Sequence, residues 1–113
     1  MKKILILFFM AALISSCSKS MYSWCDYEKT SYNYYKKQTP QATNALIETY
    51  RNMIENASKS KRKVVPPGMY AEYGYLLIQN GQKKLGLFEL KKEIETYPES
   101  ATYINRIIKL SEQ

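Results

Sequence analysis

Residues 67–98 read PGMYAEYGYLLIQNGQKKLGLFELKKEIETYP, and this stretch decides the fold. Residues 69–79 carry apolar side chains at spacings of three and four, a pattern that predicts an amphipathic helix. The Asn-Gly pair at 80–81 interrupts the pattern, residues 82–97 resume it, and Pro98 ends it. The stretch therefore predicts two helices joined by a short turn, which is a helical hairpin.

The hairpin resembles one repeat of the tetratricopeptide type, whose period is about 34 residues. On that pattern Tyr70 stands where the repeat has a large aromatic residue, and Gly74 and Gly86 stand where it has small ones. Leu90 occupies a large apolar position and Pro98 the closing proline. The resemblance implies a tetratricopeptide-like pair of helices that cross closely at the two glycines.

Glu93 departs from this pattern, because the repeat usually has alanine there, between packed helices. A carboxylate at such a site must reach solvent or meet a basic partner, since an unpaired buried charge costs on the order of several kcal/mol. Glu93 is therefore a candidate contact with a partner. The alternative interpretation is a position that is simply exposed in so short an array.

Residues 22–57 predict a first pair of helices. One helix is expected to run to about Lys37, with an inner face formed by Trp24, Tyr27, Ser31 and Tyr35. Thr39 can cap the next helix, and Pro40 suits its first turn. The expected buried stripe of that second helix is Ala42, Ala45, Leu46, Thr49, Met53, Ile54 and Ala57.

Two further segments complete the fold. Residues 58–68 (SKSKRKVVPPG) are polar, then basic, then rigid, which predicts a linker between the two helical pairs. Residues 99–113 predict a last helix that caps the stack, with one apolar side formed by Ala101, Ile104, Ile107 and Ile108. The sequence therefore predicts an all-α, tetratricopeptide-like domain of four or five helices over residues 22–113.

The amino terminus has the form of a secretory signal peptide. Lys2 and Lys3 precede an uninterrupted apolar run over residues 4–14 (ILILFFMAALI). A membrane-spanning helix needs about 20 apolar residues, so this run is too short to span a bilayer. A cationic head, a short apolar core and a small-residue exit together predict a signal peptide that is removed from the mature protein.

The sequence Ile14-Ser-Ser-Cys17 resembles the lipobox of bacterial lipoproteins. The resemblance implies cleavage of residues 1–16, attachment of diacylglycerol and palmitate to Cys17, and a lipidated tether over residues 17–21. Ser18 follows the cysteine, and by the sorting rule of Gram-negative lipoproteins a residue other than aspartate there implies the outer membrane. We expect a lipid-anchored protein facing the periplasm, and an ordinary cleaved signal peptide with Cys17 merely nearby is the alternative.

The mature chain of 97 residues is long enough for one small domain, and its net charge falls from +7 to +5 because two of the 17 basic residues leave with the signal peptide. Much of the excess is local, at Lys59, Lys61, Arg62 and Lys63. This cluster predicts contact with the anionic groups of peptidoglycan or lipopolysaccharide, or else a solvated loop. Nucleic acid is a poor candidate partner, because export separates the chain from it.

The inventory of reactive side chains excludes several kinds of catalytic and metal sites. The chain contains no histidine, so a Cys/His dyad, a His-based metal site and a Ser/His/Asp triad cannot form. Cys25 is a lone thiol after Cys17 becomes the anchor, and it predicts an intermolecular disulfide, a redox-sensitive site or a small buried residue. Glu89 and Glu93 share a helix face among lysines, which indicates a solvated surface more than a catalytic pair. We expect no enzymatic activity, cofactor or metal.

The mature chain resembles a family of short, uncharacterised bacterial lipoproteins. The resemblance lies in the opening Tyr22-Ser-Trp24-Cys25-Asp26-Tyr27, where the family pattern has glycine at position 25, and in the closing Tyr97-Pro98-Glu99-Ser100. Such lipoproteins tend to be encoded beside a lipoprotein resembling the curli-secretion channel and another small lipoprotein. The resemblance implies a shared envelope complex and carries no established activity.

The leading functional hypothesis is a non-enzymatic accessory subunit of an outer-membrane lipoprotein complex. The 11 tyrosines exceed what so small a core can bury, and exposed aromatic rings are enriched at binding sites. Some tyrosines are expected in the core, namely Tyr27, Tyr35, Tyr70, Tyr73 and Tyr97. The candidate partner contacts at the surface are Tyr22, Tyr32, Tyr34 and Tyr103. Assembly with a second copy of the chain or with a partner is also expected, since one good repeat is visible where about three are normally needed.

Overall fold

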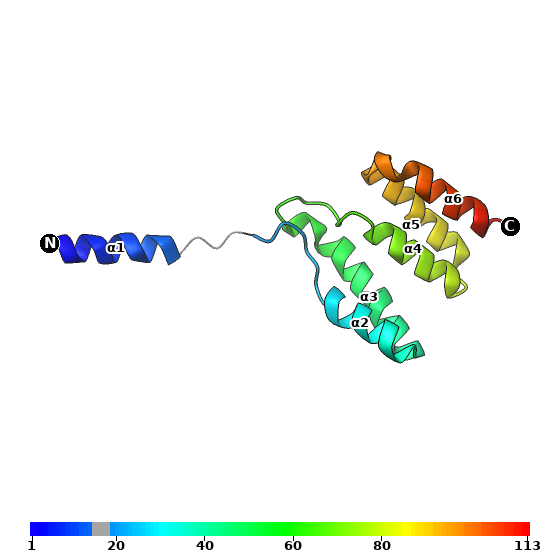
Figure 1. Cartoon of the computed structure of the whole chain (residues 1–113), viewed down its shortest axis with the longest axis horizontal. Coiled ribbons are helices and arrows are strands. Elements are labelled where there is room, and N and C mark those ends of the chain that lie inside the picture. The colour runs from blue at the N-terminus through cyan, green and yellow to red at the C-terminus, as the bar shows by residue number, and fades with distance from the viewer. Residues whose placement is uncertain (15–18) are drawn as a thin grey trace.

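The computed structural model describes the backbone of residues 1–14 and 19–113 and the side chains of residues 1–9 and 19–113. The predicted lipidation site, Cys17, lies outside the described residues. Every regular element in the described part of the chain is helical, which confirms the all-α prediction (Figure 1). The elements are α1 (Lys2–Ile14), α2 (Tyr27–Lys37), α3 (Pro40–Asn56), η1 (Ala57–Lys59), α4 (Met69–Gln79), α5 (Lys83–Thr96), η2 (Pro98–Ser100) and α6 (Ala101–Ser111).

Helix α1 coincides with the predicted signal peptide. Its described apolar side chains, from Ile4 to Phe9, are exposed. None of the described helices combines the length and the hydropathy needed to cross a membrane.

Helix α2 begins at Tyr27, three residues later than the aromatic pattern predicted. The backbone of Cys25 has a φ of 50°, in the left-handed region that interrupts a helix, so Trp24 stays outside α2. The predicted inner face is also wrong at Tyr35, whose side chain is 71% exposed. Trp24 would share a face with Tyr27, Ser31 and Tyr35 only if the helix continued through Cys25, and it does not.

Helix α3 begins as its sequence predicted. The hydroxyl oxygen of Thr39 accepts a hydrogen bond from the backbone N–H of Ala42 at 3.1 Å, and Pro40 occupies the first turn. The predicted stripe is buried at Ala42, Leu46, Thr49, Met53 and Ala57, half-buried at Ile54 and exposed at Ala45. The core also includes Ile47 and Tyr50. Because α3 packs against both α2 and α4, it buries a wider arc than a single stripe.

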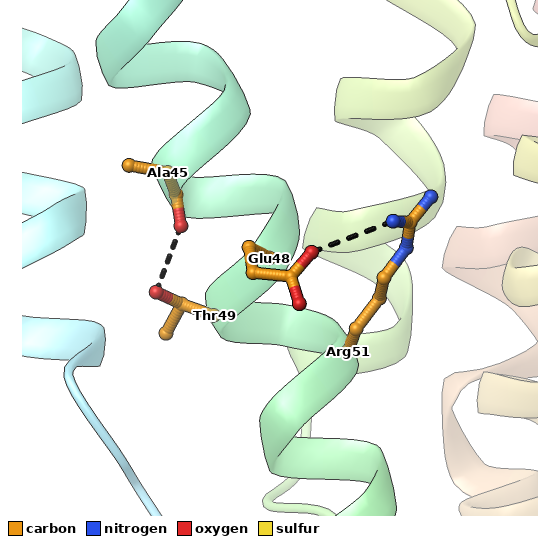
Figure 2. A network of polar contacts seen from close by, with 4 residues as sticks. All are labelled: Ala45, Glu48, Thr49 and Arg51. Atoms are coloured by element: carbon orange, nitrogen blue, oxygen red, sulfur yellow. Dashed lines mark hydrogen bonds and ion pairs between the residues drawn. The ribbon is translucent and has the colours of Figure 1, made fainter.

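Polar contacts on α3 are unequal in their effect on stability (Figure 2). The hydroxyl of buried Thr49 donates to the carbonyl oxygen of Ala45 at 2.9 Å and lies 2.9 Å from the hydroxyl of Thr30 on α2. This chain of contacts joins two helices inside the fold. Glu48 and Arg51 form an ion pair at 3.4 Å between two exposed side chains, and such pairs contribute about 0–1 kcal/mol.

Helices α4 and α5 form the predicted hairpin, with close crossing at Gly74 and Gly86. A Cβ atom on Gly74 would lie 2.6 Å from the carbonyl oxygen of Gly86, and a Cβ on Gly86 would lie 2.5 Å from the carbonyl oxygen of Gly74. The two backbones therefore touch, which confirms the predicted role of the glycines. Leu77 and Leu90 are fully buried in this pair.

The remaining segments close one end of the stack. Helix α6 packs against α5, and its Ile104 is buried. The linker between α3 and α4 is exposed in its basic half, but Val65 and Pro66 are buried. The hydroxyl of Tyr97, at the end of α5, donates to the carbonyl oxygen of Val65 at 2.6 Å. The linker is thus packed into the fold and lies at the end where α4 and α6 begin (Figure 1).

Candidate partner-binding groove

A groove of about 750 Å³ lies between α4 and α6. Both helices pack against α5, which leaves their outer faces next to each other with a depression between them. We call this depression the α4–α6 groove. It is lined by Gly68, Ala71, Glu72, Tyr75, Tyr103, Arg106, Ile107 and Leu110.

Two tyrosines and a leucine give the α4–α6 groove an exposed, largely apolar wall. Tyr75 is 50% exposed and Tyr103 is 67% exposed, and Leu110 is also exposed. Tyr73 lies two residues before Tyr75 and is buried. Because successive helical residues are about 100° apart, the two rings face opposite sides of α4. A tyrosine ring with an apolar body and a polar tip is well suited to bind a partner.

A smaller depression of about 240 Å³ adjoins the α4–α6 groove. It lies between α2, α3 and α4, and both depressions include Glu72 and Tyr75 in their linings. Tyr34 and Tyr35 of α2 form its outer edge. The two depressions therefore form a continuous surface from α2 across α4 to α6.

Glu72 joins three helices at the centre of this surface. The hydroxyls of Tyr27 on α2 and Tyr50 on α3 donate to the same carboxylate oxygen, Oε2, at 2.7 and 3.0 Å. Burial raises the pKa of both tyrosines, and the nearby Glu72 carboxylate raises the pKa of each further. Both tyrosines thus stay protonated and keep donating, which fixes the carboxylate in place.

The predicted tyrosine contacts lie in different places. Tyr103 lines the α4–α6 groove, and Tyr34 is half-buried against the core beside the smaller depression. Tyr32 is exposed on α2 in a separate shallow pocket that includes Cys25. Tyr22 is half-buried before α2, with its ring edge against Trp24.

The sequence interpretation missed Tyr75 and Leu110 as surface residues. Tyr75 follows Tyr73 by two positions, a spacing that places it on the opposite face of α4. Tyr103, Ile107 and Leu110 have spacings of four and three, which form a second apolar stripe on α6 beside the buried one. Both signals were available in the sequence.

Glu93 is buried, which corrects the interpretation of this position as exposed. Only 2% of the residue is accessible, and its Oε1 accepts a hydrogen bond from the backbone N–H of Gly68 at 2.7 Å. Among the described residues no basic side chain forms an ion pair with this carboxyl group. Its partner is a backbone N–H at the start of α4, one of the donors for which a helix supplies no acceptor of its own.

Glu89 is buried as well, so the interpretation of this helix face as a solvated surface is also wrong. The residue is 5% exposed, and its carboxylate lies 3.9 Å from the ammonium group of Lys92. The close glycine crossing brings this face of α5 against α4. One oxygen of each carboxyl, Oε2, has no hydrogen-bond partner among the described residues.

Burial raises the pKa of both carboxyl groups. For Glu93 the backbone N–H groups of Gly68, Ala71 and Tyr70 oppose the shift without cancelling it. For Glu89 the charge of Lys92 opposes it in the same way. The folded protein therefore holds protons on these groups at pH values where the unfolded chain releases them.

The raised pKa values predict that the two carboxyls make the protein less stable as pH rises. Their contribution is fully present below the ordinary glutamate pKa, about 4.3, and is lost as pH rises through the higher folded pKa. Replacing Glu89 and Glu93 together by glutamine should flatten this decline, measured as urea midpoints from about pH 4 to about pH 7. If the urea midpoint of the double variant fell between about pH 4 and about pH 7 by as much as that of the wild type, the prediction would be contradicted.

The four predicted anion contacts lie on the surface, in the exposed half of the linker. Lys59, Lys61, Arg62 and Lys63 are all exposed, and we call residues 59–63 the basic loop. The ammonium group of Lys59 donates to the side-chain oxygen of Asn56 at 2.9 Å. Within residues 19–113, ion pairs form elsewhere, at Arg51–Glu48 and Lys92–Glu89.

Cys25 is exposed, so its interpretation as a small buried residue is wrong. Its φ of 50° is the conformation that glycine adopts without strain, which accounts for the glycine expected at this position of the opening motif. No group of three or more Cys, Asp or Glu side chains in the described part of the chain is placed to hold a metal ion.

A protein-family model described as a domain of unknown function (DUF4810) matches residues 21–107. The match extends from the segment beside the basic loop into α6 and leaves the predicted signal peptide and Cys17 outside it. No curated protein and no solved structure matches the chain. Because the match covers well over half of its residues, the chain belongs to the DUF4810 family.

Proposed function

We propose that the protein is a non-enzymatic accessory subunit of an outer-membrane lipoprotein complex, held by a lipid on Cys17. The α4–α6 groove would bind a segment of another envelope lipoprotein. The lipobox supports the anchor, and the tetratricopeptide-like spacing of residues 67–98 supports an interaction role, because paired helices of this type bind peptide segments on their exposed faces.

The exposed tyrosines of the α4–α6 groove are the observation that carries this proposal. Tyr75 and Tyr103 stand on facing helices and leave half or more of each residue in contact with solvent. Glu72 and Arg106 add one charge of each sign to the lining. A partner segment with apolar side chains and complementary charges at its two edges would bind there in one orientation.

The buried carboxyls support a role without catalysis. A carboxylate-based glycan hydrolase would need Glu89 and Glu93 as its catalytic pair, and both residues are buried. A hydrolytic pair must face a substrate from two sides. Glu93 is also engaged with the backbone of Gly68, which gives it a packing role.

The groove proposal predicts that Tyr75→Ala and Tyr103→Ala weaken partner binding. Tyrosine anchors at the centre of an interface contribute about 2 kcal/mol, so each variant should bind about thirtyfold more weakly. The measurement is crosslinking in living cells, followed by solubilisation of the envelope and recovery of what co-purifies. We expect a specific envelope lipoprotein with the wild type and little of it with either variant.

Tyr32→Ala is the matched control, since it removes an equally exposed tyrosine that lies outside the groove. Recovery that is unchanged in the groove variants, or lost equally in the control, would contradict the proposal. Cys17→Ser tests the anchor separately and should abolish palmitate labelling. Recovery of a second copy of this chain alone would replace the partner with self-association.

A further inference from the structure

The segment that follows the predicted lipidation site is fixed to the basic loop. The backbone N–H groups of Lys61 and Arg62 donate to the carbonyl oxygens of Ser20 and Met21 at 3.0 and 3.1 Å. The hydroxyl of Ser23 then donates to a carbonyl oxygen at the end of α3 at 3.0 Å. Residues 20–23 therefore lie along one end of the helical stack (Figure 1).

The covalent chain keeps this end of the stack close to the anchor. Ser20 is three residues from Cys17, and a chain advances at most about 3.6 Å per residue, so the two lie within about 11 Å of each other. Exposed charges at physiological ionic strength act over about 8 Å. The bound of about 11 Å is comparable to this screening length, so a lipid on Cys17 keeps the basic loop near the bilayer surface.

The side chains at this end have the chemistry of a membrane surface site. The four cations of the basic loop are exposed and form no ion pair with a carboxylate in the described part of the chain, and exposed Lys19 adds a fifth cation. Tyr22 and Trp24 lie in the same N-terminal segment with ring centroids 6.2 Å apart, and Trp24 is exposed. Cations bind lipid phosphates, and tyrosine and tryptophan favour the boundary between water and lipid.

We propose that the basic loop binds the headgroups of anionic phospholipids, so that lipid and loop together attach the protein to the membrane. The proposal rests on the lipid anchor of the proposed function and adds the orientation of the domain. A polybasic segment beside a lipid chain is a second, electrostatic attachment that a lipid alone lacks. The loop end of the stack faces the bilayer.

This orientation determines where the α4–α6 groove points. Helix α4 begins at Met69, directly after the linker, and α6 begins at Ala101, shortly after Tyr97 has bonded to Val65. Both walls of the groove therefore start at the membrane end. With the basic loop on the bilayer, the groove extends outward from the membrane towards Leu110, where a partner in the periplasm can enter it.

The test uses Trp24, the single tryptophan of the chain, as its probe. The full lipidated protein is reconstituted into phosphatidylcholine vesicles with and without phosphatidylglycerol, with a small fraction of lipid carrying a nitroxide on its headgroup. We expect quenching of Trp24 fluorescence to rise about twofold when phosphatidylglycerol is present. High salt, where the screening length falls to about 3 Å, should remove this increase.

Two variants with the same change in charge separate the loop from a general effect of net charge. In the test variant, Lys59, Lys61, Arg62 and Lys63 are all replaced by glutamate, and the increase in quenching should disappear. In the control, Lys36, Lys37, Lys83 and Lys84 are replaced by glutamate. These four exposed residues lie at the end of α2 and the start of α5, away from the loop, so the increase should remain. Circular dichroism checks that both variants fold.

Each outcome decides between the loop and its alternatives. Equal quenching in both kinds of vesicle, or an increase lost in the control as well, would overturn the proposal. The proposal would also be overturned if phosphatidylglycerol left the quenching unchanged and the wild-type protein pelleted with purified peptidoglycan while the test variant did not. That result would assign the basic loop to peptidoglycan. If the protein failed to float with phosphatidylcholine vesicles, the proposed lipid anchor would be wrong. If the groove variants still recovered the crosslinked partner, the proposed groove would be wrong. Both results are independent of the increase in quenching.

Discussion

Gly86→Ala is expected to lower the free energy of unfolding by about 3 kcal/mol, because the new methyl group has no room. The added Cβ would lie 2.5 Å from the carbonyl oxygen of Gly74 and 2.6 Å from the side chain of Ile78. A backbone carbonyl cannot rotate away as a side chain can, so α4 and α5 must separate. Overpacking of this kind costs about 1–3 kcal/mol, and contact with backbone favours the upper end.

The sign of the change in stability distinguishes a backbone clash at Gly86 from an effect of helix propensity. In an exposed helix interior, alanine stabilises relative to glycine by about 1 kcal/mol, so helix propensity alone predicts the opposite sign. Thermal unfolding should show a midpoint lower by about 15 °C, on the scale of about 4–8 °C per kcal/mol for a small domain. Glu95→Ala, at an exposed position of the same helix, is the control and should change the midpoint little. A stable Gly86→Ala protein would mean that the helices do not cross at the glycines.

Glu93→Ala is expected to cost about 3 kcal/mol of folding free energy. The substitution leaves the backbone N–H of Gly68 without its acceptor in a partly buried site, which costs about 1–3 kcal/mol. It also removes one buried methylene group, which contributes about 0.8 kcal/mol, together with the buried carboxyl group. Urea unfolding monitored by circular dichroism measures the loss.

Glu93→Gln is the informative companion, since its amide oxygen can still accept from Gly68 and its volume is conserved. We expect it to lose less than about 1 kcal/mol, because it keeps an acceptor for the N–H and needs no proton to be neutral. If alanine and glutamine destabilise equally, the hydrogen bond to Gly68 is not what holds the residue. If alanine costs nothing, the carboxyl is not buried in solution.

The α4–α5 hairpin could be predicted from sequence because its signals are local and agree with one another. The apolar spacing, the Asn-Gly turn, Pro98 and the paired glycines all indicate the same two helices, and the structure has them within one residue of the predicted bounds. Thr39 and Pro40 fixed the start of α3 for the same reason. Short-range chemistry of this kind needs no knowledge of the rest of the fold.

The errors arose where a distant segment decides the outcome. Glu93 is buried because the start of α4, 25 residues earlier in the chain, supplies a backbone donor that no side-chain pattern records. Tyr50 is buried because α3 is packed on two sides. Trp24 lies outside α2 because the backbone at Cys25 has a positive φ, which a cysteine side chain does not predict.

The groove residues show the same division. Tyr103 was predicted as a surface contact, and the structure places it in the α4–α6 groove. Tyr75 was not predicted as a surface contact. Its near neighbour Tyr73 fits the core pattern, whereas Tyr75 lies on the opposite, exposed face of α4. Which exposed tyrosines share a surface depends on how α4 and α6 lie against α5, and this follows only from packing.

The bond between Glu93 and Gly68 also bears on the order in which the chain folds. Helix α4 has no side-chain cap of its own, and Gly68 has a φ of 90° at its start. The acceptor for its first turn comes from the last part of α5, so nucleation of α4 alone gains little. In a chain that emerges amino terminus first, α4 gains this bond only after α5 has been synthesised.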